Sequence, residues 1–153
     1  MDTALKIYTD GGCHGNPGPG GWAFVIITKS FAGEQIVAQN KGGQKETTNN
    51  RMELTAVIEA LRYLKTRNDL PGRATVITDS QYVQKGISEW IITWKKNSWR
   101  TSDKKPVKNK DLWEELDSFC GDFKLNFEWV KGHAGNKYNE MCDVLTQDAI
   151  ESL

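Results

Sequence analysis

Cysteine and histidine are scarce in this sequence, and the net charge is zero. The three cysteines, Cys13, Cys120 and Cys142, are odd in number and include no Cys-x-x-Cys pair, so neither a disulfide framework nor a structural zinc site is expected. Basic residues number 20 and so do acidic ones, a balance that by itself argues against a nucleic-acid-binding protein. We therefore expect free thiols, and we look for local rather than overall charge.

Long apolar runs are also absent, and no stretch is long enough to cross a membrane. The first residues, MDTALKIYTD, have the pattern of a strand rather than of a secretion signal. No repeat, linker or low-complexity tract interrupts the 153 residues. We expect one cytoplasmic domain over 1–153 that buries roughly two-thirds of its unfolded surface, with no membrane partner and as a monomer.

The order of the apolar patterns predicts a mixed α/β fold, a five-stranded sheet flanked by helices. The predicted strands lie at 5–9, 22–28, 35–39, 74–79 and 124–130. The predicted helices run from Asn50 to before Pro71 and over 79–86, 88–96, 110–119 and 136–151, with the second and third separated at Gly86.

Two aspartates stand at the ends of predicted strands. Asp10 ends the run IYTD and Asp79 ends the run VITD. A crossover helix allows these strands to be parallel neighbours, which would place the two carboxylates about 5 Å apart at the edge where open α/β sheets have their sites. Taken alone, an aspartate before Gly11 is more typical of a turn. The other acidic residues of the chain decide between the two interpretations.

Glu53 and Asp143 each have an ordinary structural explanation. Glu53 follows Asn50 by three residues and could close a capping box, and Asp143 lies in the first two turns of a predicted helix, where its charge suits the helix dipole. Carboxylates that converge on one edge repel one another unless a cation is present. Oxygen ligands without a cysteine or histidine cluster favour Mg²⁺ or Mn²⁺, and two such ions suit in-line attack on a phosphodiester.

Positive charge is concentrated between residues 85 and 110, which we call the basic segment. It has eight basic side chains against two acidic ones, a net charge of +6, so the rest of the chain carries −6. Such a segment would direct one face toward a phosphate backbone, although a solvated surface and, for Trp90 and Trp94, core packing remain alternatives. The candidate binding residues here are Trp90, Trp94, Lys95, Lys96, Trp99, Arg100, Lys104, Lys105 and Lys108.

The PGPGG and TTNN stretches add small and amide side chains. Small residues let a nucleic-acid backbone approach closely. Asn16, Asn49 and Asn50 can hydrogen-bond ribose 2′-hydroxyls, which distinguish RNA from DNA. Contacts to sugars and phosphates imply little sequence preference.

Five ordered stretches together resemble bacterial type 1 ribonuclease H from about residue 5 to residue 149. They are YTDGGCHGNPGPGGW, TTNNRMEL, TDSQYV, WKKNSWRTSDKKPVKNKDLW and WVKGHAGNKYNEMCD. The resemblance implies an endonuclease that uses two Mg²⁺ ions, with Mn²⁺ as a possible substitute. Its expected partner is an RNA/DNA hybrid, of which it would hydrolyse the RNA strand to leave 5′-phosphate and 3′-hydroxyl ends.

The same resemblance implies roles for individual residues. Asp10, Glu53, Asp79 and Asp143 would be the metal-binding and catalytic acids, with Asp10 bridging both ions. His133, in the loop KGHAG, would assist proton transfer or the release of product and metal, although a histidine in a glycine loop is often only solvated. Thr48 would hold a DNA phosphate, and the basic segment would bind the DNA strand.

Three positions depart from the family pattern. Glu46 stands two residues before Thr48, where a basic residue often helps to hold the phosphate, and Val144 and Thr146 follow the last aspartate in place of the more usual residues. Two rival functions remain open at this point. The same fold serves enzymes that cut DNA, against which the amide-rich stretch argues, and a hybrid-binding module without catalysis is disfavoured because all four acids are present.

Overall fold

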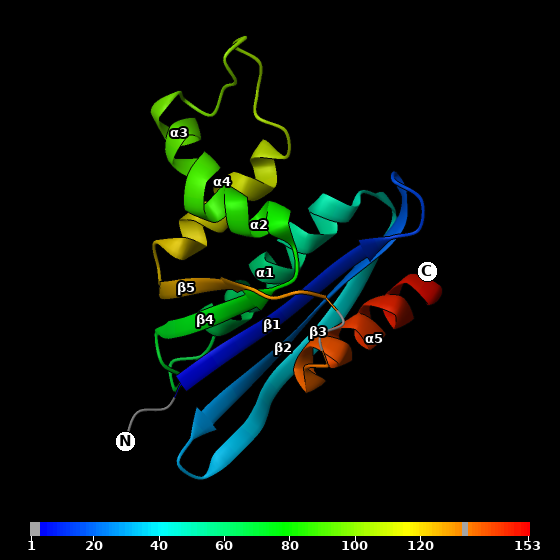
Figure 1. Ribbon diagram of the computed structural model, residues 1–153, viewed down its shortest axis with the longest axis vertical. Helices are drawn as coiled ribbons and strands as arrows, with labels where there is room; N and C mark the ends of the chain where they lie inside the picture. Colours follow the sequence, from blue (N-terminus) through cyan, green and yellow to red (C-terminus); the bar gives the residue numbers. More distant parts are fainter. Residues whose placement is uncertain (1–3, 133–134) are drawn as a thin grey trace.

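The computed structural model describes residues 4–132 and 135–153. One five-stranded sheet runs through them, in the order β3-β2-β1-β4-β5 (Figure 1). The strands β1, β2 and β3 are antiparallel neighbours, whereas β4 pairs in parallel with both β1 and β5, which confirms the mixed sheet. The strand bounds are β1 Ala4–Cys13, β2 Gly18–Ser30, β3 Gly33–Thr47, β4 Arg73–Thr78 and β5 Lys124–Trp129.

Helices cover both faces of the sheet. Their bounds are α1 Asn49–Lys65, α2 Gln81–Lys85, the π-helical turn η1 Gly86–Trp90, α3 Ile91–Lys96, α4 Lys110–Cys120 and α5 Lys137–Glu151. Figure 1 shows the chain between α3 and α4 extending well beyond the sheet. No helix of the described residues is long and apolar enough to span a membrane.

Side chains from alternating strand residues contribute to two hydrophobic cores, one on each face of the sheet, because successive side chains of a strand point to opposite faces. On one face, Ile7 and Ile26 pack with the apolar side of α1 and with Trp113 of α4. On the other face, Tyr8 and Val25 pack with Cys142 and its neighbours on α5. The sheet is therefore held between α1 and α5, and both helices carry predicted acidic residues.

The sequence pattern predicted that the first strand ends at Asp10, but β1 is longer. It continues to Cys13, with Gly11 and Gly12 paired to Trp22 and Gly21 of β2, and the turn follows only at residues 14–17. A side chain at Gly11 would lie 2.4 Å from the backbone nitrogen of Glu53. Glycine at this position allows α1 to approach the sheet closely, which is a reason other than a turn for its presence.

The predicted separation of two helices at Gly86 is present only as a change of helix type, because α2 ends at Lys85 and the π-helical turn η1 begins at Gly86. The backbone of Gly86 is right-handed helical (φ −60°, ψ −46°), and α2, η1 and α3 follow one another without an interruption. A Cβ atom at Gly86 would lie 2.0 Å from the Cη2 atom of Trp113, which is fully buried. The glycine is required for close packing against Trp113, and a helix breaker and a packing glycine look alike in a sequence.

We expect Gly86→Ala to lower the melting temperature by several degrees. Alanine normally favours a helix over glycine, so a loss would come from overpacking against Trp113, which typically costs about 1–3 kcal/mol. Gly72→Ala is the matched control, because no atom of the described residues lies within 4 Å of a Cβ atom there. Thermal unfolding followed by circular dichroism measures both variants, and equal melting temperatures would contradict the packing role.

Candidate active site

Three carboxylates from three different elements converge at one edge of the sheet. Parallel pairing of β1 with β4 ends at Thr9 opposite Thr78, so the next residues, Asp10 and Asp79, lie side by side. Glu53 reaches them from α1, and one oxygen from each of the three carboxylates lies within 4.8 Å of the others. The spacing of about 5 Å that the sequence predicted for the two aspartates is confirmed.

The position of Glu53 is not explained by a capping box. The N-cap of α1 is Thr48, whose Oγ1 accepts a hydrogen bond from the backbone N–H of Arg51 at 3.3 Å. Asn50 therefore lies inside the first turn, and Glu53 lies one turn further along, buried against β1. The predicted helix start was one residue late, and the alternative explanation that depended on it is wrong.

Asp143 reaches the same region from α5. A small depression is lined by Asp10, Asp79, Asn139, Glu140 and Asp143. Asn139 and Glu140 were not among the sequence candidates, although their positions four and three residues before Asp143 place them on the same side of a helix. Helical spacing around a predicted ligand is thus the signal that could have identified them.

Burial and mutual repulsion make this cluster electrostatically strained. The pKa of Asp10 is raised from its usual 3.8 to about 7, first because burial disfavours the charged form and then because Asp79 and Asp143 repel it. The nearby Thr146 hydroxyl and the Gly11 N–H act in the opposite direction. The pKa of Glu53 is also raised well above its usual value, chiefly by burial. The cluster therefore favours the uptake of positive charge, as protons or as a cation.

The donor set fits a hard divalent cation. Asp10, Glu53 and Asp79 offer carboxylate oxygens within 4.8 Å of one another, and these are ligands that Mg²⁺ and Mn²⁺ prefer. Glu53 Oε1 is buried and has no hydrogen-bond partner among the described residues, and a buried polar atom of this kind requires an explanation. A cation between Glu53 and the neighbouring aspartates would satisfy this atom and reduce the repulsion.

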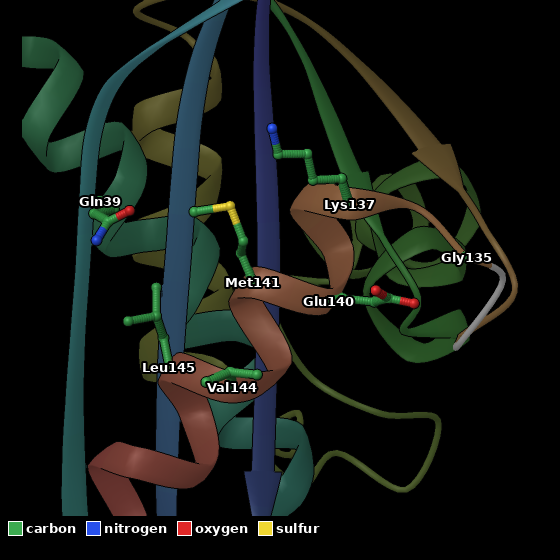
Figure 2. A pocket seen from close by; sticks show the side chains of 7 residues that line it. All are labelled: Gln39, Gly135, Lys137, Glu140, Met141, Val144 and Leu145. Atoms are coloured by element: carbon green, nitrogen blue, oxygen red, sulfur yellow. The ribbon is translucent and has the colours of Figure 1, made fainter.

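A second pocket adjoins Glu140 on another side and is mostly apolar. Figure 2 shows Met141, Val144 and Leu145 of α5 along it, with Gln39 of β3 opposite. Val144, one of the departures from the family pattern, is 67% exposed there. The pocket offers few groups that could act on a phosphodiester, so the carboxylate depression is the better candidate for chemistry.

The predicted sugar and phosphate contacts lie together at the start of α1. The side-chain Oδ1 of Asn16 accepts a hydrogen bond from the backbone N–H of Asn49 at 3.1 Å, which holds the loop after β1 beside Thr48. Asn49 is exposed and Asn50 half-buried. Glu46 and Lys45, just before Thr48, are both exposed. Sequence reasoning thus identified residues that the fold brings together.

The three tryptophans of the basic segment pack against one another and toward the core. Ring centroids are 5.9 Å apart between Trp90 and Trp94 and 6.3 Å apart between Trp94 and Trp99. Trp94 also lies 5.4 Å from Trp113. The packing alternative is correct for these side chains, and because each remains half-buried, only part of each ring is left for a ligand.

The basic side chains of this segment are largely exposed. Lys95 lies 3.3 Å from Asp117, but within residues 4–132 and 135–153 no ion pair is found for the other five candidates, which are Lys96, Arg100, Lys104, Lys105 and Lys108. Five cations without a carboxylate partner therefore project from the extended part of the molecule. His133, the remaining candidate, lies outside the described residues.

Comparison with known proteins agrees with this geometry. The family model described as RNase H matches residues 2–151. Ribonuclease H of Treponema denticola is 53% identical over 97% of this chain and 98% of its own, and Ribonuclease H of Cupriavidus necator is 52% identical over 97% of each. The chain belongs to the ribonuclease H family of enzymes.

Solved structures show the same fold. LC9-RNase H1, a type 1 RNase H with the type 2 active-site motif, has a TM-score of 0.86 and 30% identity over 99% of this chain and 74% of that one. LC11-RNase H1 in complex with RNA/DNA hybrid has a TM-score of 0.72 and 25% identity over 97% of each chain. The ribonuclease H fold expected from the sequence is confirmed.

We expect Asp10→Asn to raise the melting temperature of the metal-free protein in EDTA near pH 8. The folded state holds the Asp10 proton more tightly than the unfolded chain, so the free energy of unfolding falls as the pH rises from about 4 to about 7 and stays low above it. One pKa unit corresponds to about 1.4 kcal/mol, and 1 kcal/mol shifts melting by about 2–4 °C in a domain of this size.

The increase should therefore amount to several degrees near pH 8 and largely disappear below about pH 3, where Asp10 is protonated in both states. Mg²⁺ should raise the melting temperature of the unsubstituted protein more than that of the variant, since it relieves the same repulsion. Differential scanning fluorimetry across this pH range tests the expectation. A variant that melts lower in EDTA, or an increase that is equal at both pH values, would refute the repulsion.

Proposed function

We propose that this protein is a metal-dependent endonuclease that hydrolyses the RNA strand of RNA/DNA hybrids and leaves 5′-phosphate and 3′-hydroxyl ends. The observation that carries the proposal is the convergence of Asp10, Glu53 and Asp79 within 4.8 Å in a chain of the ribonuclease H family. The hybrid bound to the related LC11-RNase H1 supports the substrate class. We propose further that the protein acts in the cytoplasm as a monomer.

In this proposal Asp10, Glu53, Asp79 and Asp143 hold two Mg²⁺ ions, for which Mn²⁺ can substitute. The chemistry that two divalent cations supply at such a site is activation of the attacking water and stabilisation of charge on the phosphate. The protein's own part is to keep the carboxylates at fixed positions before substrate arrives. The close approach of α1 to β1 at Gly11 and the hydrogen bond from Trp129 Nε1 to the Asp79 carbonyl, at 3.0 Å, support that arrangement.

Recognition is proposed to depend on sugars and phosphates. Asn16, Asn49 and Asn50 would bind ribose 2′-hydroxyls, and Thr48 would bind a phosphate of the DNA strand near the positive end of α1. The exposed cations of the basic segment would bind further phosphates of the same strand, while partly exposed edges of Trp90, Trp94 and Trp99 would line the contact. His133 is proposed to assist proton transfer or the release of product and metal.

The test uses labelled RNA/DNA hybrid, RNA duplex and DNA duplex, each with Mg²⁺ and with EDTA. We expect cleavage of the RNA strand of the hybrid alone, only with the metal, and abolished by Asp10→Asn. The products should be substrates for a ligase that requires a 5′-phosphate. The matched control is Asp148→Asn, which should remain active. Asp148 is a carboxylate of the same helix, but it pairs with Lys41 and does not line the depression.

Each rival predicts a different result. Cleavage of the DNA duplex would identify a DNA-cutting enzyme, and tight hybrid binding without cleavage would identify a binding module. Full turnover by Asp10→Asn would overturn the assignment of the carboxylates even if hybrid were the substrate.

Glu46→Arg should tighten hybrid binding by a few-fold up to roughly tenfold at low salt. A carboxylate two residues from Thr48 repels a phosphate bound there, and at an effective dielectric of about 20 two like charges about 6 Å apart repel by about 3 kcal/mol before screening. Salt and side-chain motion should reduce this to on the order of 1 kcal/mol or less. The gain should shrink at higher salt.

The measurement is the hybrid dissociation constant at two salt concentrations, in an Asp10→Asn background that prevents cleavage. Glu34→Arg is the matched control, because it makes the same charge change in an exposed residue at the other end of β3. If both substitutions have the same effect, Glu46 lies outside the phosphate contact.

A further inference from the structure

Arg51, in the first turn of α1, joins that helix to the start of α4. Its Nη1 donates to Asp111 Oδ1 at 3.0 Å and to Asn109 Oδ1 at 3.3 Å, and its Nη2 donates to Asp111 Oδ2 at 2.7 Å. We call Arg51, Asn109 and Asp111 the Arg51 clamp. The backbone N–H of the same arginine donates to Thr48 Oγ1, so one residue bonds to both the N-cap of α1 and the end of the basic segment.

The clamp is also fixed to the core. Asn109 has a left-handed backbone (φ 60°, ψ 29°), a conformation that asparagine adopts more readily than most residues. Its Nδ2 donates to the hydroxyl of Tyr82 at 3.1 Å, and the same hydroxyl accepts from Nε1 of Trp113 at 2.9 Å. Because Trp113 is fully buried, the point at which the basic segment rejoins the fold has a defined position relative to α1.

Stability alone is a weak explanation for this arrangement. The side chains of Arg51 and Asp111 are 34% and 64% exposed, and ion pairs with that much exposure usually add little to the free energy of unfolding. The segment is also held together internally, since the backbone N–H of the buried Val107 donates to the Trp99 carbonyl at 3.0 Å. What the clamp adds is a fixed orientation between the segment and the N-terminus of α1.

We propose that the Arg51 clamp is a positioning element that sets the spacing between two hybrid contacts, the one at Thr48 and the one along the basic segment. The inference rests on the proposed function. Two contacts held at a fixed spacing bind a stiff duplex together, with less loss of conformational freedom than two contacts that move independently. Arg51 itself is engaged by Asp111, so it acts by orientation and not as a further phosphate ligand.

Asp111→Ala separates positioning from electrostatics, because the two predict opposite signs. Removal of a carboxylate near a polyanion should tighten binding if only charge matters. If the clamp positions the basic segment, Asp111→Ala should instead weaken hybrid binding about three- to tenfold. Glu114→Ala is the matched control, since it removes one exposed carboxylate from α4 that lies 4.0 Å from Lys110 and takes no part in the clamp.

A double-mutant comparison identifies what the clamp acts on. Lys96→Ala with Lys105→Ala removes exposed cations of the basic segment. In that background Asp111→Ala should weaken binding less than twofold, because the basic segment has already lost two of the cations that the clamp would position. Dissociation constants are measured in the Asp10→Asn background, and melting temperatures confirm that the variants are folded. Asp111→Asn, which keeps one oxygen for Arg51, should restore part of the affinity.

The inference is overturned if Asp111→Ala binds hybrid as tightly as its parent, or if its effect is undiminished without the two lysines. The second result would point to a direct contact of Arg51 with the hybrid. If the parent itself does not bind hybrid, the proposed function fails and the inference fails with it. If the Asp10→Asn parent binds hybrid but the clamp variants do not behave as expected, the positioning role of the clamp is refuted and the proposed function is not.

Discussion

The close approach of α1 to β1 at Gly11 is the contact on which the rest of the site depends. Because no side chain stands between them, the backbone of Met52 and Glu53 lies against the strand, and a Cβ atom would come within 2.4 Å of both residues. This brings a buried glutamate beside Asp10 and Asp79. The same contact fixes the start of α1, and therefore Thr48 and its neighbours, relative to the carboxylates.

The cost of that approach is electrostatic, and it links folding to the site's chemistry. Burial and repulsion raise the pKa values of Asp10 and Glu53. In the metal-free protein, ionisation of these two carboxyl groups is therefore unfavourable. A bound cation would remove this opposition to ionisation, because carboxylates that repel one another would then be attracted to the same positive charge. The site is therefore arranged for positive charge before any substrate is present, and stability is lower than a neutral cluster would allow.

Elements with strong periodicity could be predicted from the sequence, whereas glycine positions could not. The parallel neighbours carrying Asp10 and Asp79 followed from two short β-type runs and a crossover helix. Gly11 and Gly86 were both interpreted as places where an element ends, but each allows another part of the chain to approach. Long-range packing decides which role a glycine has, and a local pattern does not contain that information. The Asn50–Glu53 spacing misled for a similar reason, because Thr48 competes for the N-cap.

Charge distribution shows why overall composition is a poor guide to binding. A net charge of zero disfavoured nucleic acid, yet five exposed cations lie at the end of α3 and between α3 and α4, while carboxylates gather at the sheet edge. The acidic cluster alone would repel a polyanion, so a substrate has to be held by contacts at a distance from the chemistry. That separation requires the two regions to keep a fixed relation, and in this fold Arg51 joins the helix that carries Glu53 to the end of the basic segment.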